Sequence, residues 1–247
     1  MTGDLTGSTA LVTGSTSGIG KAVAVSLAAL GAQVLVSGRD DTRGEAVVAE
    51  IRASGGKADF VAGELGDADS VRALARQAVS LGHVDILVNN AGIFPAGPTA
   101  LTTGDEIDAV YAVNVRAPYL LVAELAPAMA ARGRGAIVNV LSMAARFGVA
   151  GMALYGSSKA ALGLLTKAWA AEFGSSGVRV NAVSPGPTRT PGTDHFGDQV
   201  DALASLAPTG RPALPEEIAA AITYLAGGDA AFVQGAILDV DGGRAAT

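Results

Sequence analysis

The sequence contains no cysteine and only two histidines, and these shortages narrow its chemistry. Without cysteine, disulfide bonds, thiolate metal sites and a cysteine nucleophile are all excluded. His83 and His195 lie far apart in the chain, so we expect no zinc motif and no Ser-His-Asp triad. We therefore predict no metal site.

Charged residues are also scarce, at 16% of the chain, and acids outnumber bases to give a formal charge of -6. The acidic excess is spread along the sequence, which argues against binding to the phosphate backbone of a nucleic acid. Apolar residues reach 49%, which is enough for a wide core and too many for a disordered chain. The composition thus predicts a folded protein without a nucleic-acid partner.

Long hydrophobic runs are missing as well. Glycine or a charged residue interrupts each apolar stretch well before the roughly 20 residues that a membrane-spanning helix needs. Residues 1–7 include Asp4 and lack a basic flank and an apolar run, unlike a secretory signal or a transit peptide. We expect a cytoplasmic protein with no membrane partner.

Short β-branched runs alternate along the chain with longer Ala/Leu-rich stretches of helical period. This alternation is typical of βαβ units around a parallel sheet with helices on both faces. Strands are expected at 10–13, 33–37, 59–62, 85–89, 136–141, 178–184 and 237–240, and helices at 19–30, 42–54, 67–81, 104–131, 154–173 and 216–225. Because no linker divides the chain, residues 1–247 are predicted to form one α/β domain, a doubly wound three-layer fold with a seven-stranded parallel sheet.

One connection differs from the others in length and composition. Residues 185–215 contain six prolines with glycines between them. This composition predicts a loop, and the loop is longer than ordinary connections. Residues 187–215 are therefore a candidate lid over a substrate site.

A glycine-rich turn, residues 13–20, joins the first strand to the first helix. Glycine lets the backbone approach a pyrophosphate, and the amino terminus of the helix faces its negative charge. The turn predicts dinucleotide binding by Gly14, Ser15, Thr16, Ser17, Gly18, Ile19 and Gly20. The plain alternative is a glycine-rich turn that binds nothing.

The end of the second strand bears on the choice of dinucleotide. An acid there binds the ribose hydroxyls of NAD, whereas a basic residue binds the 2′-phosphate of NADP. Here Gly38 and Arg39 follow Ser37, and the planar guanidinium of Arg39 can bind a phosphate. We predict NADP(H), with NAD(H) as the alternative if Arg39 is a surface residue paired with Asp40 or Asp41.

Tyr155 and Lys159 lie four residues apart at the start of an expected helix, so their side chains share one face. A free tyrosine has a pKa of about 10, and a nearby ammonium stabilises the phenolate and lowers that pKa. Tyr155 could then protonate an oxygen that hydride transfer leaves negatively charged. The ordinary alternative is an amphipathic helix with a half-buried Tyr155 and a solvated Lys159.

Together these segments resemble the short-chain dehydrogenase/reductase family, and within it the bacterial 3-oxoacyl-[acyl-carrier-protein] reductases. The resemblance covers nearly the whole chain. It rests on motifs in the family's order: residues 13–20, Asn89-Asn90-Ala91-Gly92, Asn114, Ser142, Tyr155 with Lys159, Pro185-Gly186 and Asp241-Gly242-Gly243. It implies a Rossmann-like fold and an NAD(P)-dependent oxidoreductase that assembles as a homotetramer or homodimer.

The resemblance also implies roles for individual residues. Ser142 would bind the substrate carbonyl, and Tyr155 would donate the proton. Lys159 would bind the nicotinamide ribose and lower the tyrosine pKa, while Asn114 would hold a water that connects Lys159 to solvent. Further cofactor contacts are implied for Glu64, Leu65, Asn90, Ala91, Gly92, Pro185, Gly186, Thr188 and Thr190.

The sequence departs from the family pattern at two cofactor positions. Glu64 stands where the family more often has aspartate, one methylene shorter. NADP-dependent members often carry a basic residue before the second glycine of the turn, and Ser17 cannot supply that charge. The prediction of NADP(H) therefore depends on Arg39.

We expect the reaction to reduce a ketone to a secondary alcohol, with a small carbonyl or alcohol compound as substrate. An apolar wall favours an apolar ketone or a β-ketoacyl thioester and is expected from Phe94, Met143, Phe147, Met152 and Phe196. Arg132 and Arg134 form only a thin basic patch for an acyl-carrier protein. The alternatives are an NAD-dependent alcohol, sugar or steroid dehydrogenase and, in another class, a non-catalytic NADP(H)-binding regulator.

Overall fold

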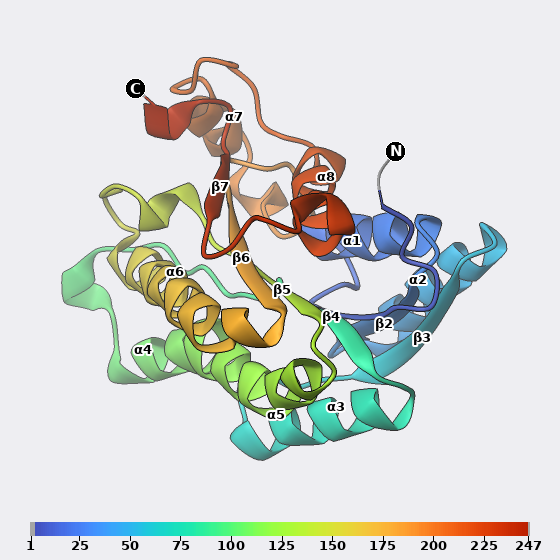
Figure 1. Ribbon diagram of the computed structural model, residues 1–247. Helices are drawn as coiled ribbons and strands as arrows, with labels where there is room; N and C mark the ends of the chain where they lie inside the picture. Colours follow the sequence, from blue (N-terminus) through green and yellow to red (C-terminus); the bar gives the residue numbers. More distant parts are fainter. Residues whose placement is uncertain (1–2, 247) are drawn as a thin grey trace.

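Seven parallel strands form one sheet in the order β3-β2-β1-β4-β5-β6-β7 (Figure 1). The computed structural model describes residues 3–246. The strands are β1 (Thr9–Thr13), β2 (Gln33–Gly38), β3 (Lys57–Ala62), β4 (Val84–Asn89), β5 (Gly135–Val140), β6 (Val178–Pro185) and β7 (Ile237–Val240). The chain reverses its direction across the sheet between β1 and β4, and ligands of doubly wound folds bind outside the carboxyl ends of strands at such a point. The predicted doubly wound sheet is confirmed.

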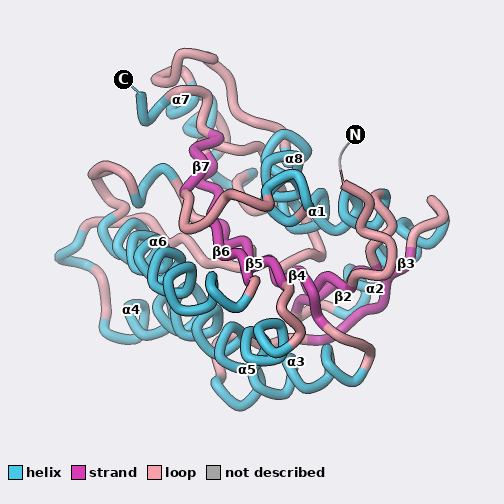
Figure 2. Tube along the Cα trace, in the orientation of Figure 1, coloured by secondary structure: helices cyan, strands magenta, loops and turns pink. Residues whose placement is uncertain are grey.

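Helices cover both faces of the sheet (Figure 2). They are α1 (Gly18–Ala29), α2 (Asp41–Ala53), α3 (Ala68–Ser80), α4 (Gly104–Tyr111), α5 (Ala117–Ala131), α6 (Ala153–Phe173), α7 (Gln199–Ala204) and α8 (Pro215–Ala226). One core cluster joins the sheet to α1, α2 and α8, and a second joins it to α3, α5 and α6. Successive residues of β1 alternate between them, since Ala10 and Val12 lie in the first cluster and Leu11 in the second. Burial on both faces explains why the strands read as nearly continuous apolar runs.

The helix expected over residues 104–131 is found with these bounds, but it contains a π-helical turn. Thr103 caps α4 in a reciprocal pair with Glu106, but residues 112–116 form a π-helical turn before α5 begins. A π turn inserts an extra residue into the helix and often marks a functional site. Asn114 lies within this turn.

The segment expected to be a loop, residues 185–215, contains short helical structure as well. A 3₁₀ turn spans Asp194–Phe196, and α7 follows it. At the base of the segment, Thr188 and Ala213 form a parallel backbone bridge. The bridge thus brings the two ends of the segment together just beyond the end of β6.

The described residues also bear on metal binding and membrane insertion. Between residues 3 and 246, His, Cys, Asp and Glu side chains nowhere gather in a group of three that could hold a metal ion. None of the helices within this range is long and apolar enough to cross a bilayer.

Candidate active site

The glycine-rich turn leaves the carboxyl end of β1 and enters α1. Gly14 and Gly18 have φ values of +63° and +54°, a left-handed conformation that favours glycine. Gly20 is needed for space instead, because a Cβ there would lie 2.4 Å from the Gly14 carbonyl oxygen and from Asn90 Nδ2. The turn therefore presents bare backbone where a ligand can approach closely.

The amino end of α1 is polar but uncapped. Its N-cap residue, Ser17, makes no side-chain capping hydrogen bond, and the first turn has no acidic residue. By contrast, the carboxylates of Asp40 and Asp67 cap α2 and α3. Free backbone N–H groups and the positive end of the helix dipole suit an anionic pyrophosphate. This end of the fold fits a dinucleotide.

Residues at the end of β4 fasten the turn to the sheet. Asn90 Nδ2 donates to the carbonyl oxygens of Thr13 and Gly14 at 2.9 and 3.1 Å. The Thr13 hydroxyl accepts from the backbone N–H groups of Asn90 and Ala91, each at 3.1 Å. The Ser15 hydroxyl is also used internally, because it donates to the Val12 carbonyl oxygen at 2.7 Å. Thr13 begins the predicted turn but is not among the predicted cofactor contacts, and its hydroxyl joins the ends of β1 and β4.

Replacing Gly20 by alanine is expected to weaken dinucleotide binding more than tenfold and to lower the melting temperature. The added methyl group overlaps backbone, and overpacking of this kind costs about 1–3 kcal/mol. Calorimetric titration and thermal unfolding measure the two effects. Gly104→Ala is the matched control, since a Cβ at Gly104 meets nothing within 4 Å. Equal effects of both substitutions would contradict the close contact.

Tyr155 and Lys159 share one face of α6 near its amino end, as their spacing predicts. Lys159 Nζ lies 5.9 Å from the centroid of the Tyr155 ring. The lysine is only 3% exposed, and its Nζ donates to the Val140 carbonyl oxygen at 2.8 Å. The ordinary alternative of a solvated Lys159 is therefore wrong.

Burial shifts the pKa values of both groups away from their charged forms. It raises the pKa of Tyr155 to about 12, and the neighbouring Ser142 hydroxyl, as a hydrogen-bond partner, acts in the opposite direction. Burial lowers the pKa of Lys159 to about 8. The predicted lowering of the tyrosine pKa by the ammonium is not seen here, where desolvation by burial dominates. Tyr155 is a protonated acid at neutral pH.

Ser142 follows β5 and begins a 3₁₀ turn, where its hydroxyl accepts from the Ala144 backbone N–H at 3.2 Å. This turn packs on α6, since a Cβ at Gly156 would lie 2.6 Å from the Ala144 carbonyl oxygen. The close approach brings the serine hydroxyl beside Tyr155. Two hydroxyl groups on different elements therefore face one reaction centre.

Asn114 is fully buried in the π turn, and three hydrogen bonds orient its amide. Its Oδ1 accepts from the Ile93 backbone N–H at 2.9 Å, and its Nδ2 donates to the Ile93 carbonyl oxygen at 2.9 Å. Nδ2 also donates to Ser158 Oγ at 3.0 Å. Sequence reasoning missed Ser158, which is buried and joins Asn114 to the helix of the Tyr/Lys pair.

Gly92 separates Asn114 from the lysine. A Cβ at Gly92 would lie 3.2 Å from Lys159 Nζ and 3.3 Å from Asn114 Oδ1. Its φ is not in the left-handed region, so backbone conformation does not require glycine here. The missing side chain leaves room between the lysine and the amide.

Arg39 is exposed just beyond β2 and forms no ion pair within residues 3–246. The neighbouring Asp40 pairs with Arg43 instead, Nε to Oδ2 at 2.8 Å. The Thr16 side chain packs against Gly38, the residue before Arg39, since a Cβ at Gly38 would lie 2.5 Å from Thr16 Cγ2. The alternative pairing of Arg39 with Asp40 or Asp41 is therefore wrong, and its guanidinium is available to a phosphate.

The adenine-side residues differ in exposure. Glu64 is exposed, and its Oε1 accepts from the Gly66 backbone N–H at 2.9 Å. Leu65 packs into the core cluster on the α3 and α5 side. A carboxylate fixed by its own loop can accept a further hydrogen bond, whereas Leu65 offers mainly its backbone.

Residues after β6 approach the glycine-rich turn from the other side. Gly186 packs on Asp241, and the Thr188 hydroxyl donates to the Gly186 carbonyl oxygen at 3.0 Å. A Cβ at Gly18 would lie 3.2 Å from the Cβ of Thr190. The structure thus brings the two expected ends of the dinucleotide site together.

The expected apolar wall is only partly assembled at this centre. Phe94 lies beside Tyr155, with ring centroids 6.0 Å apart. Phe147 is turned to a different neighbour, because the Arg244 guanidinium lies 4.6 Å from its ring centroid. Met143 is buried as the first residue of the 3₁₀ turn.

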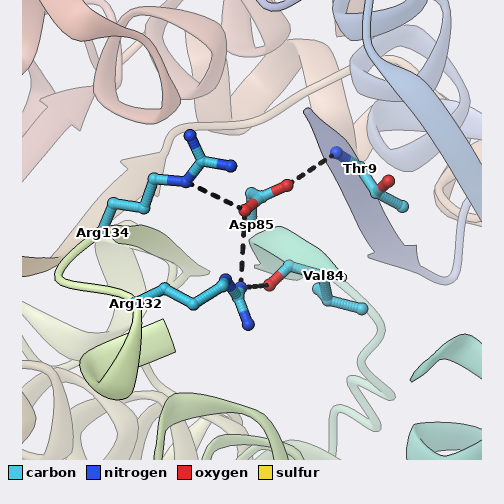
Figure 3. A network of polar contacts seen from close by, with 5 residues as sticks. All are labelled: Thr9, Val84, Asp85, Arg132 and Arg134. Carbon is cyan, nitrogen blue, oxygen red and sulfur yellow. Dashed lines mark hydrogen bonds and ion pairs between the residues drawn. The ribbon is translucent and has the colours of Figure 1, made fainter. Parts of the chain in front are cut away.

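Arg132 and Arg134, the thin basic patch, meet an internal carboxylate (Figure 3). Asp85 lies 3.4 Å from Arg132 Nη2 and 3.6 Å from Arg134 Nε. It also accepts from the Thr9 backbone N–H at 3.2 Å, and Arg132 donates to the Val84 carbonyl oxygen at 2.8 Å. Thr9 and Val84 begin their strands, so this network lies at the amino edge of the sheet, opposite the site.

Comparison with known proteins agrees with this geometry. A family model described as "Enoyl-(Acyl carrier protein) reductase" matches residues 14–245. The chain is 39% identical to a D-threitol dehydrogenase of Mycolicibacterium smegmatis, over 97% of this chain and 93% of the relative. A solved 3-oxoacyl (acyl-carrier-protein) reductase from Agrobacterium tumefaciens with NADP bound is 32% identical, with a TM-score of 0.93 over 97% of this chain and 95% of that chain. A solved short chain dehydrogenase/reductase family protein is 51% identical, with a TM-score of 0.93 over 99% of this chain and 100% of that chain. Since the matches span nearly the whole length, the chain belongs to the short-chain dehydrogenase/reductase family.

Proposed function

We propose that this protein binds NADP(H) and reduces a ketone to a secondary alcohol. The observation that carries the proposal is the buried Lys159 beside the half-buried Tyr155, which adjoins Ser142. NADPH, when bound, supplies the hydride that the carbonyl carbon accepts. A screen of NADPH oxidation against ketones, quinones and β-ketoacyl thioesters tests the proposal.

The side chains have separate roles in this proposal. Ser142 and Tyr155 donate hydrogen bonds to the substrate oxygen, where negative charge develops, and such donors are most effective in a dry site. Tyr155 then transfers its phenol proton to that oxygen. Lys159 and Asn114 flank the space left by Gly92, where a water can carry a replacement proton from solvent. The ketone gains a hydride at carbon and a proton at oxygen.

The protonation state of Tyr155 fits the role of proton donor. With a pKa of about 12, Tyr155 holds its proton at neutral pH and can donate it. Alcohol oxidation needs the phenolate as a base instead, which becomes common only at high pH. We therefore propose that Tyr155 is the acid in carbonyl reduction, while the concentrations of substrate and cofactor set the net direction.

Arg39→Ala is expected to raise the Kd for NADPH by roughly 10- to 100-fold and to leave the Kd for NADH nearly unchanged. A hydrogen bond to a charged group is worth about 1.5–3 kcal/mol, and only NADPH carries the 2′-phosphate. Titration of both cofactors by fluorescence measures the effect. Arg76→Ala, which removes another exposed arginine, is the control. Tighter binding of NADH than of NADPH by the wild type would overturn the cofactor assignment.

An NAD-dependent alcohol or sugar dehydrogenase is the second candidate, and the D-threitol dehydrogenase relative favours it. A steroid dehydrogenase belongs to the same NAD-dependent alternative. The same titrations separate the two cofactors, and a panel of secondary alcohols tests oxidation. A non-catalytic NADP(H)-binding regulator would need no proton donor, so the assembled Tyr155, Lys159 and Ser142 argue against it.

The structure offers little support for an acyl-carrier protein as partner, because Asp85 already pairs with Arg132 and Arg134.

A homotetramer or homodimer stays a prediction, as does the cytoplasm as compartment. Apolar side chains on α5 and α6 support assembly, since Tyr119 is 52% and Leu164 70% exposed. Leu164→Glu is expected to reduce the mass measured by light scattering after gel filtration. An unchanged mass in this variant would place the interface elsewhere.

A further inference from the structure

Aromatic rings form a column that begins at the proposed proton donor. Phe94, from the loop after β4, lies 6.0 Å from the Tyr155 ring, centroid to centroid, in an edge arrangement at 65°. Phe94 also lies 6.4 Å from His195, nearly parallel at 20°, and 6.1 Å from Phe196. The His195 and Phe196 rings are themselves 4.0 Å apart. The column therefore extends from the phenol to the 3₁₀ turn after β6.

The segment that carries the outer rings spans the site. At one end, Thr190 packs against Gly18 of the glycine-rich turn. In the middle, a Cβ at Gly192 would lie 3.5 Å from Phe94 Cζ, an ordinary contact distance. Residues 190–196 thus lie between the expected cofactor site and Phe94. Phe94 and Phe196 both remain partly exposed, so their rings are accessible to a ligand.

We propose that this column recognises the ring of a cyclic or aromatic ketone, with Phe94 as the residue that determines specificity. The inference rests on the proposed reduction of ketones and narrows its substrate class. An aromatic ring gains an offset or edge contact with an aromatic face beyond the area that it buries, whereas a saturated ring is puckered and gains mainly from its rigidity. An open-chain ketone offers no flat face and loses more torsional freedom when it binds. We expect ring ketones to be preferred by about tenfold in kcat/KM, since ring contacts of this kind are worth roughly two- to tenfold each.

Matched pairs of ketones test the preference in the wild-type protein with NADPH. Cyclohexanone is compared with methyl butyl ketone, and acetophenone with methyl hexyl ketone, so that each pair has equal carbon numbers. Phe94→Leu keeps an apolar side chain and removes the flat face. Comparing this variant with wild type on one ketone cancels the intrinsic reactivity of that ketone. The variant is expected to lose about tenfold in kcat/KM on the ring ketones and to change less than about threefold on the open-chain ketones.

Two further variants separate ring recognition from general packing. Phe94→Tyr keeps the flat ring and is expected to retain the preference. Phe232→Leu removes a fully exposed phenylalanine from the loop after α8 and is expected to change nothing. Equal losses on ring and open-chain ketones in Phe94→Leu would overturn the proposal.

Binding without turnover distinguishes this inference from the proposed function. Saturation-transfer NMR reports acetophenone binding to the protein with NADP⁺ present, whether or not any ketone is reduced. If acetophenone binds the wild type and Phe94→Leu abolishes this binding, ring recognition is supported. If the wild type also reduces none of the four ketones, only the proposed reduction is overturned. Acetophenone binding that is absent, or insensitive to Phe94→Leu, overturns ring recognition.

Discussion

Tyr155→Phe is expected to lower kcat for ketone reduction by a factor of about 10² to 10⁴, because it removes the proton donor and keeps the ring. The Phe94 contact and the packing of α6 depend on the ring rather than the hydroxyl. The Kd for NADPH, measured by fluorescence titration, and the melting temperature should therefore stay close to wild type. Stopped-flow measurement of NADPH oxidation gives the rate.

Tyr111→Phe is the matched control for this substitution. Like Tyr155→Phe, it removes a phenol hydroxyl that hydrogen-bonds a serine, since Tyr111 Oη lies 3.1 Å from Ser157 Oγ. Tyr111 is not one of the proposed catalytic residues. Its activity should remain near wild type. A Tyr155→Phe enzyme that keeps more than a tenth of the wild-type rate would show that another group donates the proton.

Lys159→Met is expected to make the protein less active and more stable at neutral pH. Activity should fall on the order of 10²-fold, because the variant loses the group that passes protons to Tyr155. Stability should rise, because the folded wild type must bury an ammonium below the lysine pKa of about 8. Steady-state kinetics and urea unfolding at pH 7 measure the two effects.

The stability difference should depend on pH in a defined direction. The folded-state pKa of Lys159 is lowered from 10.5 to about 8, so between these values the unfolded chain binds more protons than the folded one. Wild-type stability therefore gains from this group as pH rises through that window, and the advantage of Lys159→Met shrinks. The comparison is best made below pH 10, because Tyr155 titrates above it. An advantage that grows from pH 8 to pH 9.5 would contradict a buried ammonium.

Local patterns in the sequence predicted most of the architecture. The β-branched runs were sufficient because the central strands are buried on both faces. A spacing of four residues likewise puts Tyr155 and Lys159 on one face of a helix. The π turn at Asn114 could not be predicted in this way. It is held by hydrogen bonds to Ile93, which lies 21 positions earlier in the chain, and no local period carries that information.

Two features of the site depend on burial, which is set by the whole fold. The sequence predicts an ammonium near Tyr155. It does not predict the desolvation that raises the pKa of Tyr155 to about 12. Likewise, Phe147 follows the proposed catalytic serine closely in sequence, yet Arg244 from the end of the chain covers its ring. Both outcomes require knowledge of what packs around a side chain.

The backbone bridge between Thr188 and Ala213 has a consequence for how this enzyme can diversify. Pairing at the base fixes where residues 189–212 depart and return, so their ends stay the same distance apart whatever lies between them. Changing the length of a closed excursion costs little, because loop-closure entropy grows only slowly with length. Insertions or exchanges within it can therefore change the wall of the proposed substrate site while β6 and β7 keep their register.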